Sequence, residues 1–301
     1  MDERDWLTAR FEQHRSYLRG VAYRMLGSVS ESDDALQEAW LRIRDQDPAS
    51  VENMQAWLAT IVGRVCLNML RSRRRRAVPW DVHVSDPVIG LEGSADSDQQ
   101  ILIADSVGLA LQVVLDSLNP AERLAFVLHD VFGVPFSEIA AVLDRSEASV
   151  QQLASRARRR VQSMPEPDPD LGRQRAVVDA FFAASRDGDF EALLAVLDPE
   201  VELRIDGGIL RKEASRVLHG AGAVAAHTAT YSRWYPFVRH AVVNGTAGAV
   251  VATTDRVLAV MAFTVTSGRI VQIEALLDPE RLAHVAARLS KAPKGPQSSS
   301  S

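Results

Sequence analysis

The chain has 301 residues, 47% of them hydrophobic, so it is long enough to form two or three compact domains with cores of their own. Its net charge of −5 argues against a protein that coats nucleic acid by bulk charge, and no apolar run is long enough to span a bilayer. The single cysteine, Cys66, excludes an intramolecular disulfide and a cysteine-rich zinc site. Because the N-terminal stretch MDERDWLTAR lacks the apolar core of a signal peptide, we expect a cytoplasmic protein and no membrane partner.

Positive charge is concentrated in two short runs, although neither part of the chain is basic overall. Residues 1–163 carry 19 arginines, no lysine and 23 acidic residues, and the remainder carries 15 basic and 16 acidic residues. The first run, Arg71 to Arg76, has five arginines in six residues, and the second, Arg156 to Arg160, has four in five. Contact with nucleic acid would therefore depend on focused patches.

Helical periodicity predicts three helices in the first region, over residues 6–26, 33–44 and 51–76. In the second helix, Ala35, Ala39, Trp40 and Ile43 would face inward. Its outward face would then carry an acidic and polar patch made of Asp34, Gln37 and Glu38. The arginine run that ends the third helix exceeds what the helix dipole favours, so we expect a phosphate partner there.

A proline-, glycine- and serine-rich stretch over residues 77–98 predicts a linker, and helical patterning resumes over 99–115 and 120–131. Residues 136–160 then have the spacing of a helix-turn-helix, in which Ser146 would cap the second helix. Hydrogen-bonding side chains near the start of that helix, and arginines farther along it, suit base edges and phosphates respectively. The alternative is an amphipathic helix hairpin with a solvated arginine face.

The last third of the chain has a different pattern. A proline-rich connector over residues 164–170 precedes two helices, over 175–184 and 190–197. Strand patterns follow, and Asn244-Gly245 and Ser267-Gly268 suit hairpin turns. The predicted strands are residues 201–205, 241–243, 249–253, 257–266 and 269–277. We therefore expect a cone-shaped α+β domain with a curved antiparallel sheet, followed by a disordered tail over residues 291–301.

Three stretches resemble bacterial RNA polymerase sigma factors of the extracytoplasmic-function type, in the order and spacing of their second and fourth domains. They read DDALQEAWLRI, AWLATIVGRVCLNMLRSRRRR and LNPAERLAFVLHDVFGVPFSEIAAVLDRSEASVQQLASRARRRV. The family usually has glycine at the helix-turn-helix turn, where this chain has Asp144, and aspartate tolerates the left-handed conformation better than most residues.

The resemblance implies a role for each of three residue sets. The first motif would bind the clamp helices of core RNA polymerase through Asp34, Gln37 and Glu38. The long helix would melt and contact the −10 promoter element, with Trp57 either a base platform or a core residue; our candidates there are Arg64, Asn68, Arg71, Arg73 and Arg74. The helix-turn-helix would contact the −35 element of promoter DNA through Ser149, Gln151, Gln152, Arg156, Arg158 and Arg159.

The third region resembles the SnoaL-like branch of the NTF2-like fold, an extension that marks the SigJ-like group of these sigma factors. The stretches AFFAASRDGDFEALLAVLDPEVELRIDGG and HGAGAVAAH carry this resemblance. The group's DGGG-type and NPDKL-type motifs appear here as DGGI at residues 206–209 and DPERL at 278–282. Its WLPEP-type linker motif is replaced by PWDVH at residues 79–83.

The sequence thus predicts a multidomain protein with two all-α sigma domains and an α+β NTF2-like cone domain. The expected parts are a sigma region 2 domain over residues 1–76, a linker over 77–98, a region 4 helix-turn-helix domain over 99–163, a proline-rich linker over 164–170, a SnoaL-like domain over 171–290 and a tail over 291–301. We expect promoter-specific initiation with core RNA polymerase, tuned by a regulatory contact of the third domain at Asp206, Gly207 and Gly208.

Two other functions remain open at this point. The chain could be a ligand-responsive helix-turn-helix repressor, or a cyclase or isomerase fused to DNA-binding modules. Catalysis in the cone would need an acid or a base, for which the candidates are Asp206, His219, His227 and His240. We expect instead that these residues are structural. No catalytic site, metal, cofactor or small-molecule ligand is assigned.

Overall fold

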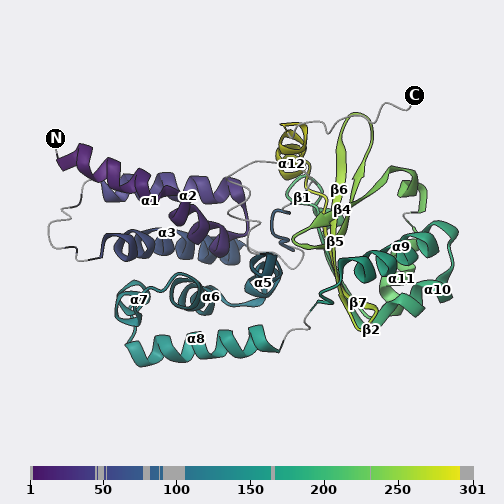
Figure 1. The fold of residues 1–301 in the computed structure, drawn as a ribbon, viewed down its shortest axis with the longest axis horizontal. Helices are drawn as coiled ribbons and strands as arrows, with labels where there is room; N and C mark the ends of the chain where they lie inside the picture. Colours follow the sequence, from purple (N-terminus) through teal and green to yellow (C-terminus); the bar gives the residue numbers. More distant parts are fainter. Residues whose placement is uncertain are drawn as a thin grey trace. The chain divides into compact units, whose positions relative to one another are not determined.

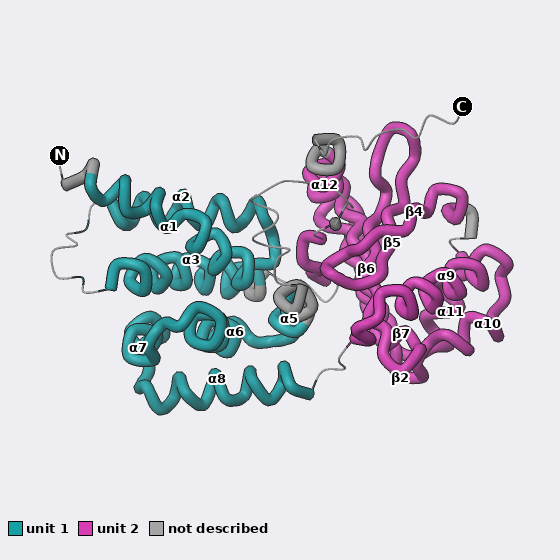
Figure 2. Tube along the Cα trace, viewed as in Figure 1, with its two compact units in different colours: residues 1–77, 111–164 teal, residues 78–110, 165–301 magenta. Residues whose placement is uncertain are grey.

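The computed structural model describes residues 3–44, 46, 51, 53–76, 82–87, 89–90, 106–163, 167–230 and 232–291. The chain forms two compact units, which Figure 2 distinguishes by colour. Unit 1 comprises residues 1–77 and 111–164, and unit 2 comprises residues 78–110 and 165–301. The two units therefore alternate along the sequence. In the described part of the chain, no helix is both long enough and apolar enough to cross a membrane.

The elements of unit 1 that the structure describes are all helices (Figure 1). Their buried side chains form one continuous hydrophobic core. Its helices are α1 (Glu3–Leu26), α2 (Val29–Ile43), α3 (Met54–Arg76), α5 (Ser106–Ser117, of which the first five residues belong to unit 2), α6 (Pro120–Phe126), the π-helix η1 (Val127–Val131), α7 (Phe136–Leu143) and α8 (Glu147–Gln162). The core joins side chains of α1, α2 and α3 to side chains of α6, α7 and α8. All the expected helices of this half are confirmed where the structure describes them.

Their ends differ from the sequence expectation by a few residues. The second helix begins at Val29 and not at Asp33, because the hydroxyl of Ser28 accepts a hydrogen bond from the Glu31 N–H and caps the helix earlier. The start of the expected 99–115 helix lies outside the described residues. The predicted 120–131 helix changes to π-helix at Val127.

Unit 2 is built around a seven-stranded sheet of order β1-β4-β5-β6-β7-β2-β3. Its strands are β1 (Ile89–Gly90), β2 (Leu197–Asp206), β3 (Arg216–His219), β4 (Val238–Val243), β5 (Thr246–Ala252), β6 (Val257–Thr266) and β7 (Arg269–Leu276). The turns at Asn244-Gly245 and Ser267-Gly268 are confirmed, since all four residues have φ between 52 and 78°.

The expectation of a wholly antiparallel sheet is wrong at one pair of strands, because β2 and β7 are parallel. Strands joined by a short hairpin must run antiparallel. The intervening strands and helices separate β2 from β7, so no tight turn sets their relative direction. The rest of the sheet is antiparallel.

Helices cover both faces of the sheet. On one face lie α9 (Leu171–Asp187), α10 (Phe190–Val196) and α11 (Ala221–Ala229), around a core that includes Phe181 and Phe263. On the other face, Leu282 and Val285 of α12 (Pro279–Lys291) pack with Val260 and Leu276. Two short 3₁₀ helices, η2 (Lys212–Ala214) and η3 (Ser232–Phe237), complete the unit. The sequence interpretation missed β3, α11 and α12.

Parts of both predicted linkers belong to unit 2. Ile89 of β1 pairs with Val243, so this part of the expected 77–98 linker is an edge strand of the sheet. In the proline-rich connector, the Asp168 N–H donates to the Val265 carbonyl at 2.8 Å, and Asp170 caps α9. The expected disordered tail lies outside the described residues, apart from Lys291. The predicted domain boundaries stay predictions.

Candidate nucleic-acid and polymerase interface

The turn between α7 and α8 has the geometry of a helix-turn-helix. Asp144 ends α7 in the left-handed conformation, with φ 54° and ψ 54°. This aspartate therefore adopts the helix-ending conformation for which glycine is usual. Its N–H donates to the Ala140 carbonyl. The Ser146 hydroxyl then accepts the Ser149 N–H at 3.3 Å and caps α8, as predicted.

Helix α8 presents a polar face to solvent. Val150, Leu153, Ala154 and Ala157 are buried. The exposed face carries Gln151, Gln152, Ser155, Arg156 and Arg159. Ser155 was missed by the sequence interpretation, although its position four residues after Gln151 places it on this face.

Two of the predicted −35 contacts have a different environment. Arg158 donates from Nε to Asp130 Oδ1 at 2.5 Å, so its guanidinium is engaged within unit 1. Ser149 is half-buried beside the cap. The available polar surface of α8 is therefore centred on Gln151, Gln152 and Arg156.

The candidate −10 residues on α3 fall into two groups. Arg64, Asn68 and Arg71 are exposed, and their spacing of four and three residues puts them on one helix face. Arg73 points to the opposite side and forms an ion pair with Glu31 of α2. The Arg74 side chain lies outside the described residues. The structure thus brings three of the five candidates together.

Helix α3 packs directly on α6 and α7 within unit 1. The Arg64 Nη2 donates to the Ala141 carbonyl of α7 at 3.0 Å. Gly63 permits the close packing of α3 on α6, since a Cβ at this position would lie 3.0 Å from a Leu124 methyl group of α6. Trp57 is partly buried against the core, which favours a packing role over a base platform.

A buried arginine forms hydrogen bonds that link helices of this core. Arg123 of α6 donates from Nε to the Arg24 carbonyl of α1 at 2.9 Å and from Nη1 to Asp116 at 2.7 Å. Burial lowers the pKa of Arg123, and the Asp116 carboxylate opposes that change. The first and second helical segments of unit 1 are therefore held together by polar as well as apolar contacts.

The predicted polymerase patch lies on the exposed face of α2. Asp34, Gln37 and Glu38 all point outward, and Glu38 forms an ion pair with Arg42 one turn later. Leu41 lies on the same face with 53% of its surface exposed. A single exposed leucine is common on protein surfaces, so it is the position of Leu41 beside Asp34, Gln37 and Glu38 that makes it a candidate contact. Leu41 lies about two helical turns after Asp34, so helical periodicity in the sequence could have placed it on this face.

In unit 2, Asp206 is a buried acceptor and not a pocket residue. Its Oδ2 accepts the Val84 N–H at 3.0 Å and Arg281 Nη1 at 2.7 Å. Its Oδ1 accepts the Gly208 N–H at 2.9 Å. Burial raises the pKa of Asp206, and the guanidinium of Arg281 acts against this rise.

Arg281 completes a cluster that fastens the segment 82–87. Its Nε donates to Asp86 at 2.6 Å and its Nη2 to the Val84 carbonyl at 2.5 Å. Gly208 has φ 64°, and a Cβ on it would overlap the Asp278 carboxylate. A Cβ on Gly207 would overlap the Arg211 carbonyl. We call Val84, Asp86, Asp206 and Arg281 the linker clasp.

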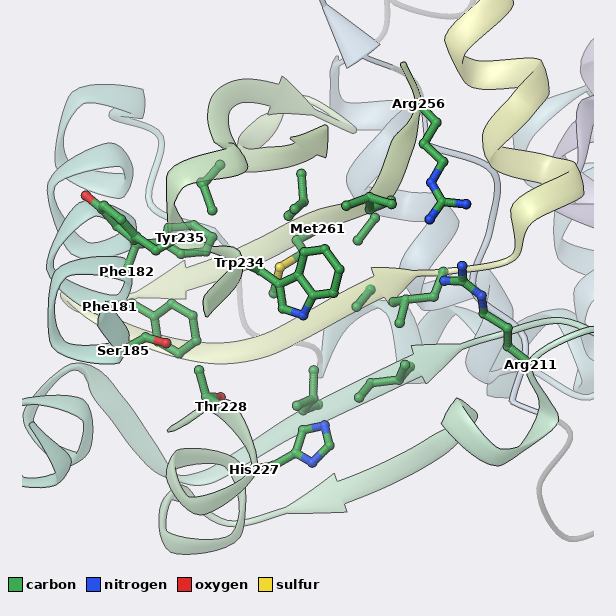
Figure 3. Close-up of a pocket in the computed structure, with 18 residues that line it drawn as sticks. Phe181, Phe182, Ser185, Arg211, His227, Thr228, Trp234, Tyr235, Arg256 and Met261 are labelled. Carbon is green, nitrogen blue, oxygen red and sulfur yellow. The ribbon is translucent and has the colours of Figure 1, made fainter. Parts of the chain in front are cut away.

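The three histidine candidates are dispersed over unit 2. His219 is exposed near Glu202, with Nδ1 and Oε2 at 3.4 Å, and His240 is exposed near Asp179. His227 alone lines the apolar cavity shown in Figure 3. Burial, together with the nearby Arg216 charge, lowers the pKa of His227. The sequence candidates do not form one acid–base constellation.

Two sequence-family models match the chain: "Sigma-70 region 2" over residues 10–76 and "Sigma-70, region 4" over residues 108–161. The helical unit with its helix-turn-helix is therefore of the sigma-factor class. The two matched segments contain the candidate patches on α2, α3 and α8.

Relatives of known name cover nearly the whole chain. The "Probable ECF RNA polymerase sigma factor SigI" of Mycobacterium tuberculosis is 33% identical, over 96% of this chain and 99% of that protein. The "ECF RNA polymerase sigma factor SigJ" of the same species is 34% identical, over 91% and 92% respectively. The crystal structure of that SigJ has a TM-score of 0.67 and 31% sequence identity, and it covers 92% of this chain.

The chain belongs to the extracytoplasmic-function RNA polymerase sigma factors, of the SigJ and SigI type. The predicted family is therefore confirmed. Helical sigma domains followed by an NTF2-like α+β domain are likewise confirmed as the fold class.

Proposed function

We propose that the chain directs core RNA polymerase to specific promoters in the cytoplasm, with α8 contacting the −35 element and α3 the −10 element. The observation that carries this proposal is the pair of exposed helical faces within the two sigma segments. The repressor alternative is not favoured, because a repressor has no need of a region 2 segment.

The α8 face suits the major groove of the upstream element. Gln151 and Gln152 have amides that can donate to and accept from base edges, and they lie in the first two turns of the helix. Arg156 and Arg159 follow on the same face and can bind phosphate. On α3, Arg71 would bind phosphate near Asn68, and Arg64 would do so once its hydrogen bond to the Ala141 carbonyl of α7 is released.

The packing of unit 1 implies that its two DNA-contacting faces separate on the polymerase. The −35 and −10 elements are about 25 base pairs apart, or roughly 85 Å at 3.4 Å per base pair. Helices that pack through a shared neighbour, as α3 and α8 do through α7, lie about 20 Å apart. The packed form therefore corresponds to a state that is not bound at both elements.

We assign the regulatory role of unit 2 to the linker clasp. The clasp restrains residues 82–87, and those residues connect the two sigma segments along the chain. A restrained connector limits how far the segments can separate. The contact predicted at Asp206 thus acts on the connector, with Gly207 and Gly208 allowing the tight loop beside it.

The residues of the cavity do not favour a catalytic function for unit 2. Asp206 is engaged in the clasp, and among the described residues that line the cavity there is no carboxylate. His227 is the one group among those described lining residues that could exchange a proton near neutral pH. We therefore propose that unit 2 regulates and does not catalyse.

In vitro transcription with core polymerase tests the main proposal. The full chain should give promoter-dependent transcripts from a cognate template, and the variant Gln151→Ala/Arg156→Ala should lose them. Absence of any promoter-dependent transcript over a genomic template library would contradict the proposal. Arg239, exposed on β4, supplies the control variant Arg239→Ala.

Removal of the residues after 165 tests the regulatory part. We expect the truncated chain to keep its promoter choice and to change the strength of transcription, because the clasp is lost. The full-length variant Arg281→Met should change the strength in the same direction. If neither change alters output, the regulatory assignment fails while the sigma function stands.

A further inference from the structure

The cavity in unit 2 has a volume of about 350 Å³, within the range of small-molecule sites. It lies between the sheet and the helices α9 and α11, so one structural unit forms it entirely. Most of its lining is apolar and comes from Phe181, Phe182, Leu203, Ile205, Trp234 and Met261. Such a surface favours an apolar occupant, because burial of that occupant releases water from both surfaces.

Among the described residues that line this cavity, the two arginines lie at one end. In Figure 3, the guanidinium groups of Arg211 and Arg256 lie at one end, whereas Phe181, Phe182 and Tyr235 lie at the other, with Trp234 between them. Arg211 is half-buried after β2, and Arg256 is exposed just before β6. The two arginines thus come from different loops and meet at the same end of an apolar space.

Neither arginine side chain forms an ion pair or hydrogen bond elsewhere in the described part of the chain. The cavity's described lining contains no aspartate or glutamate that could neutralise them. Two guanidinium groups facing one cavity repel each other, and an anion between them would turn that repulsion into attraction. Arginine is also the side chain best suited to bidentate contact with a carboxylate.

We propose that this cavity binds an amphipathic carboxylic acid, with the carboxylate between Arg211 and Arg256 and the apolar body against Phe181, Trp234 and Met261. The chemical class is that of medium-chain fatty acids and aromatic carboxylic acids, which share an anionic head and an apolar body. This site goes beyond the proposed function and does not depend on it, since no DNA or polymerase residue is involved.

The loop that carries Arg211 directly follows Asp206, one of the four residues of the linker clasp. Asp206 begins this loop, and the Gly207 backbone lies against the Arg211 carbonyl. Ile205 and Leu277 line the cavity, and the Leu277 N–H donates to the Asp206 carbonyl at 2.7 Å. A ligand that fixes Arg211 therefore orders the loop that begins at Asp206, whose carboxylate accepts the Val84 N–H.

Calorimetric titration of the full chain tests the site. The probes are octanoate, 2-naphthoate and octan-1-ol, the last of which has the apolar chain but no charge. We expect one site for at least one of the acids, with octan-1-ol at least about tenfold weaker, because it cannot form charge-assisted hydrogen bonds. The acid with the higher affinity shows whether the cavity prefers an extended chain or a flat aromatic body.

Substitution of the two arginines tests whether they bind the carboxylate. Arg211→Gln/Arg256→Gln should weaken binding of the acid at least about tenfold and leave octan-1-ol unchanged. The control Arg175→Gln changes an exposed arginine of α9 that does not line the cavity, so it should bind as the wild type does. Thr228→Trp should fill the cavity and block all three probes, with circular dichroism to verify its fold.

Three results would each overturn the proposal. These are no saturable binding of either acid up to millimolar concentration, equal affinity for octan-1-ol and octanoate, and undiminished acid binding by the double arginine variant. The arginine variants keep the test decisive even if Thr228→Trp does not fold, because Arg211 and Arg256 are not core residues.

Discussion

Arg281 donates from Nη1 to Oδ2 of Asp206 at 2.7 Å, although the two residues are 75 positions apart in the sequence. Both side chains are largely buried, with 15% and 5% of their surfaces exposed. The same guanidinium binds Asp86 and the Val84 carbonyl, so one arginine joins three segments of the chain. The connector between the sigma segments is thus part of the fold of unit 2.

Replacement of Arg281 by methionine should release this connector. The Asp206 carboxyl would then be buried without its cation, which costs roughly 3–5 kcal/mol when a buried pair loses one partner. We expect faster amide hydrogen exchange at Val84 and a lower free energy of unfolding of unit 2. Arg239→Met, at an exposed position, is the control. Unchanged exchange at Val84 would show that the clasp does not hold the connector.

Gly208 and Gly188 form a matched pair for a test of the loop. Both have positive φ, 64° and 68°, but only at Gly208 would a Cβ overlap another residue, Asp278. Gly188→Ala should therefore cost about 1 kcal/mol through the left-handed backbone alone. Gly208→Ala should cost clearly more, because the Asp278 carboxylate must move. Urea unfolding followed by circular dichroism measures both, and equal losses would refute the steric argument.

On α8, Arg156 and Arg158 should differ in their contribution to DNA binding by the polymerase complex. Arg156 is exposed, so Arg156→Ala should lower the slope of log affinity against log salt by about 1. Arg158 is paired with Asp130 at 2.5 Å, so Arg158→Ala should change the slope less. Binding assays over a salt series measure both slopes. A wild-type slope for Arg156→Ala would remove this residue from the phosphate contacts.

Leu41 should contribute to polymerase binding. Leu41→Asp places a charge at the end of the α2 patch, where desolvation on binding would be unfavourable, and we expect affinity for core polymerase to fall at least about tenfold. Leu210→Asp, at a residue of unit 2 that is 62% exposed, is the matched control. Pull-down of core polymerase at graded concentrations measures the effect. Similar affinities for the two variants would place the polymerase contact elsewhere.

The stability of unit 2 should fall in mild acid because of His227. Burial lowers the pKa of His227 in the folded chain below its usual 6.5, so the unfolded chain takes up a proton first as the pH falls. The resulting stability is present above about pH 6.5 and decreases as the pH drops toward the folded pKa. Hydrogen exchange of β2 and β6 amides at several pH values measures this decrease.

The variant His227→Gln should lose less stability over that pH range than the wild type. His284→Gln, which removes an exposed histidine of α12, should behave as the wild type does. An identical pH dependence in His227→Gln would mean that another group is responsible.

Local features of the fold followed from the sequence because they depend on residues only a few positions apart. The left-handed Asp144, the Ser146 cap and the two hairpin turns each arise from one short segment. The outward polar faces of α2 and α8 follow in the same way from helical periodicity. These features were sufficient to predict the sigma-factor family and the position of the helix-turn-helix.

Other features depended on contacts between distant residues, which periodicity does not specify. The pairing of Arg158 with Asp130 and of Arg73 with Glu31 reduced the sets of candidate DNA contacts. The helix α11 was missed because its small apolar residues have little helical periodicity and pack only against one face of the sheet. The helix α12 could have been predicted, since Pro279 begins it and Leu282, Val285 and Leu289 have helical spacing. Asp206 was expected to make a regulatory contact, but its partners were not predictable.

The sequence by itself determined the family, the two sigma segments and the α+β class of the third region, since each is encoded by patterns of short range. The tertiary structure alone decided that residues 82–87 belong to unit 2 and that Arg211 and Arg256 share a cavity. Asp86 and Arg281 are separated by 195 residues, and only the folded sheet brings such positions together. A buried charged side chain must be paired, and here the partners come from segments that only the fold brings together. The linker clasp therefore depends on the tertiary structure and not on local sequence.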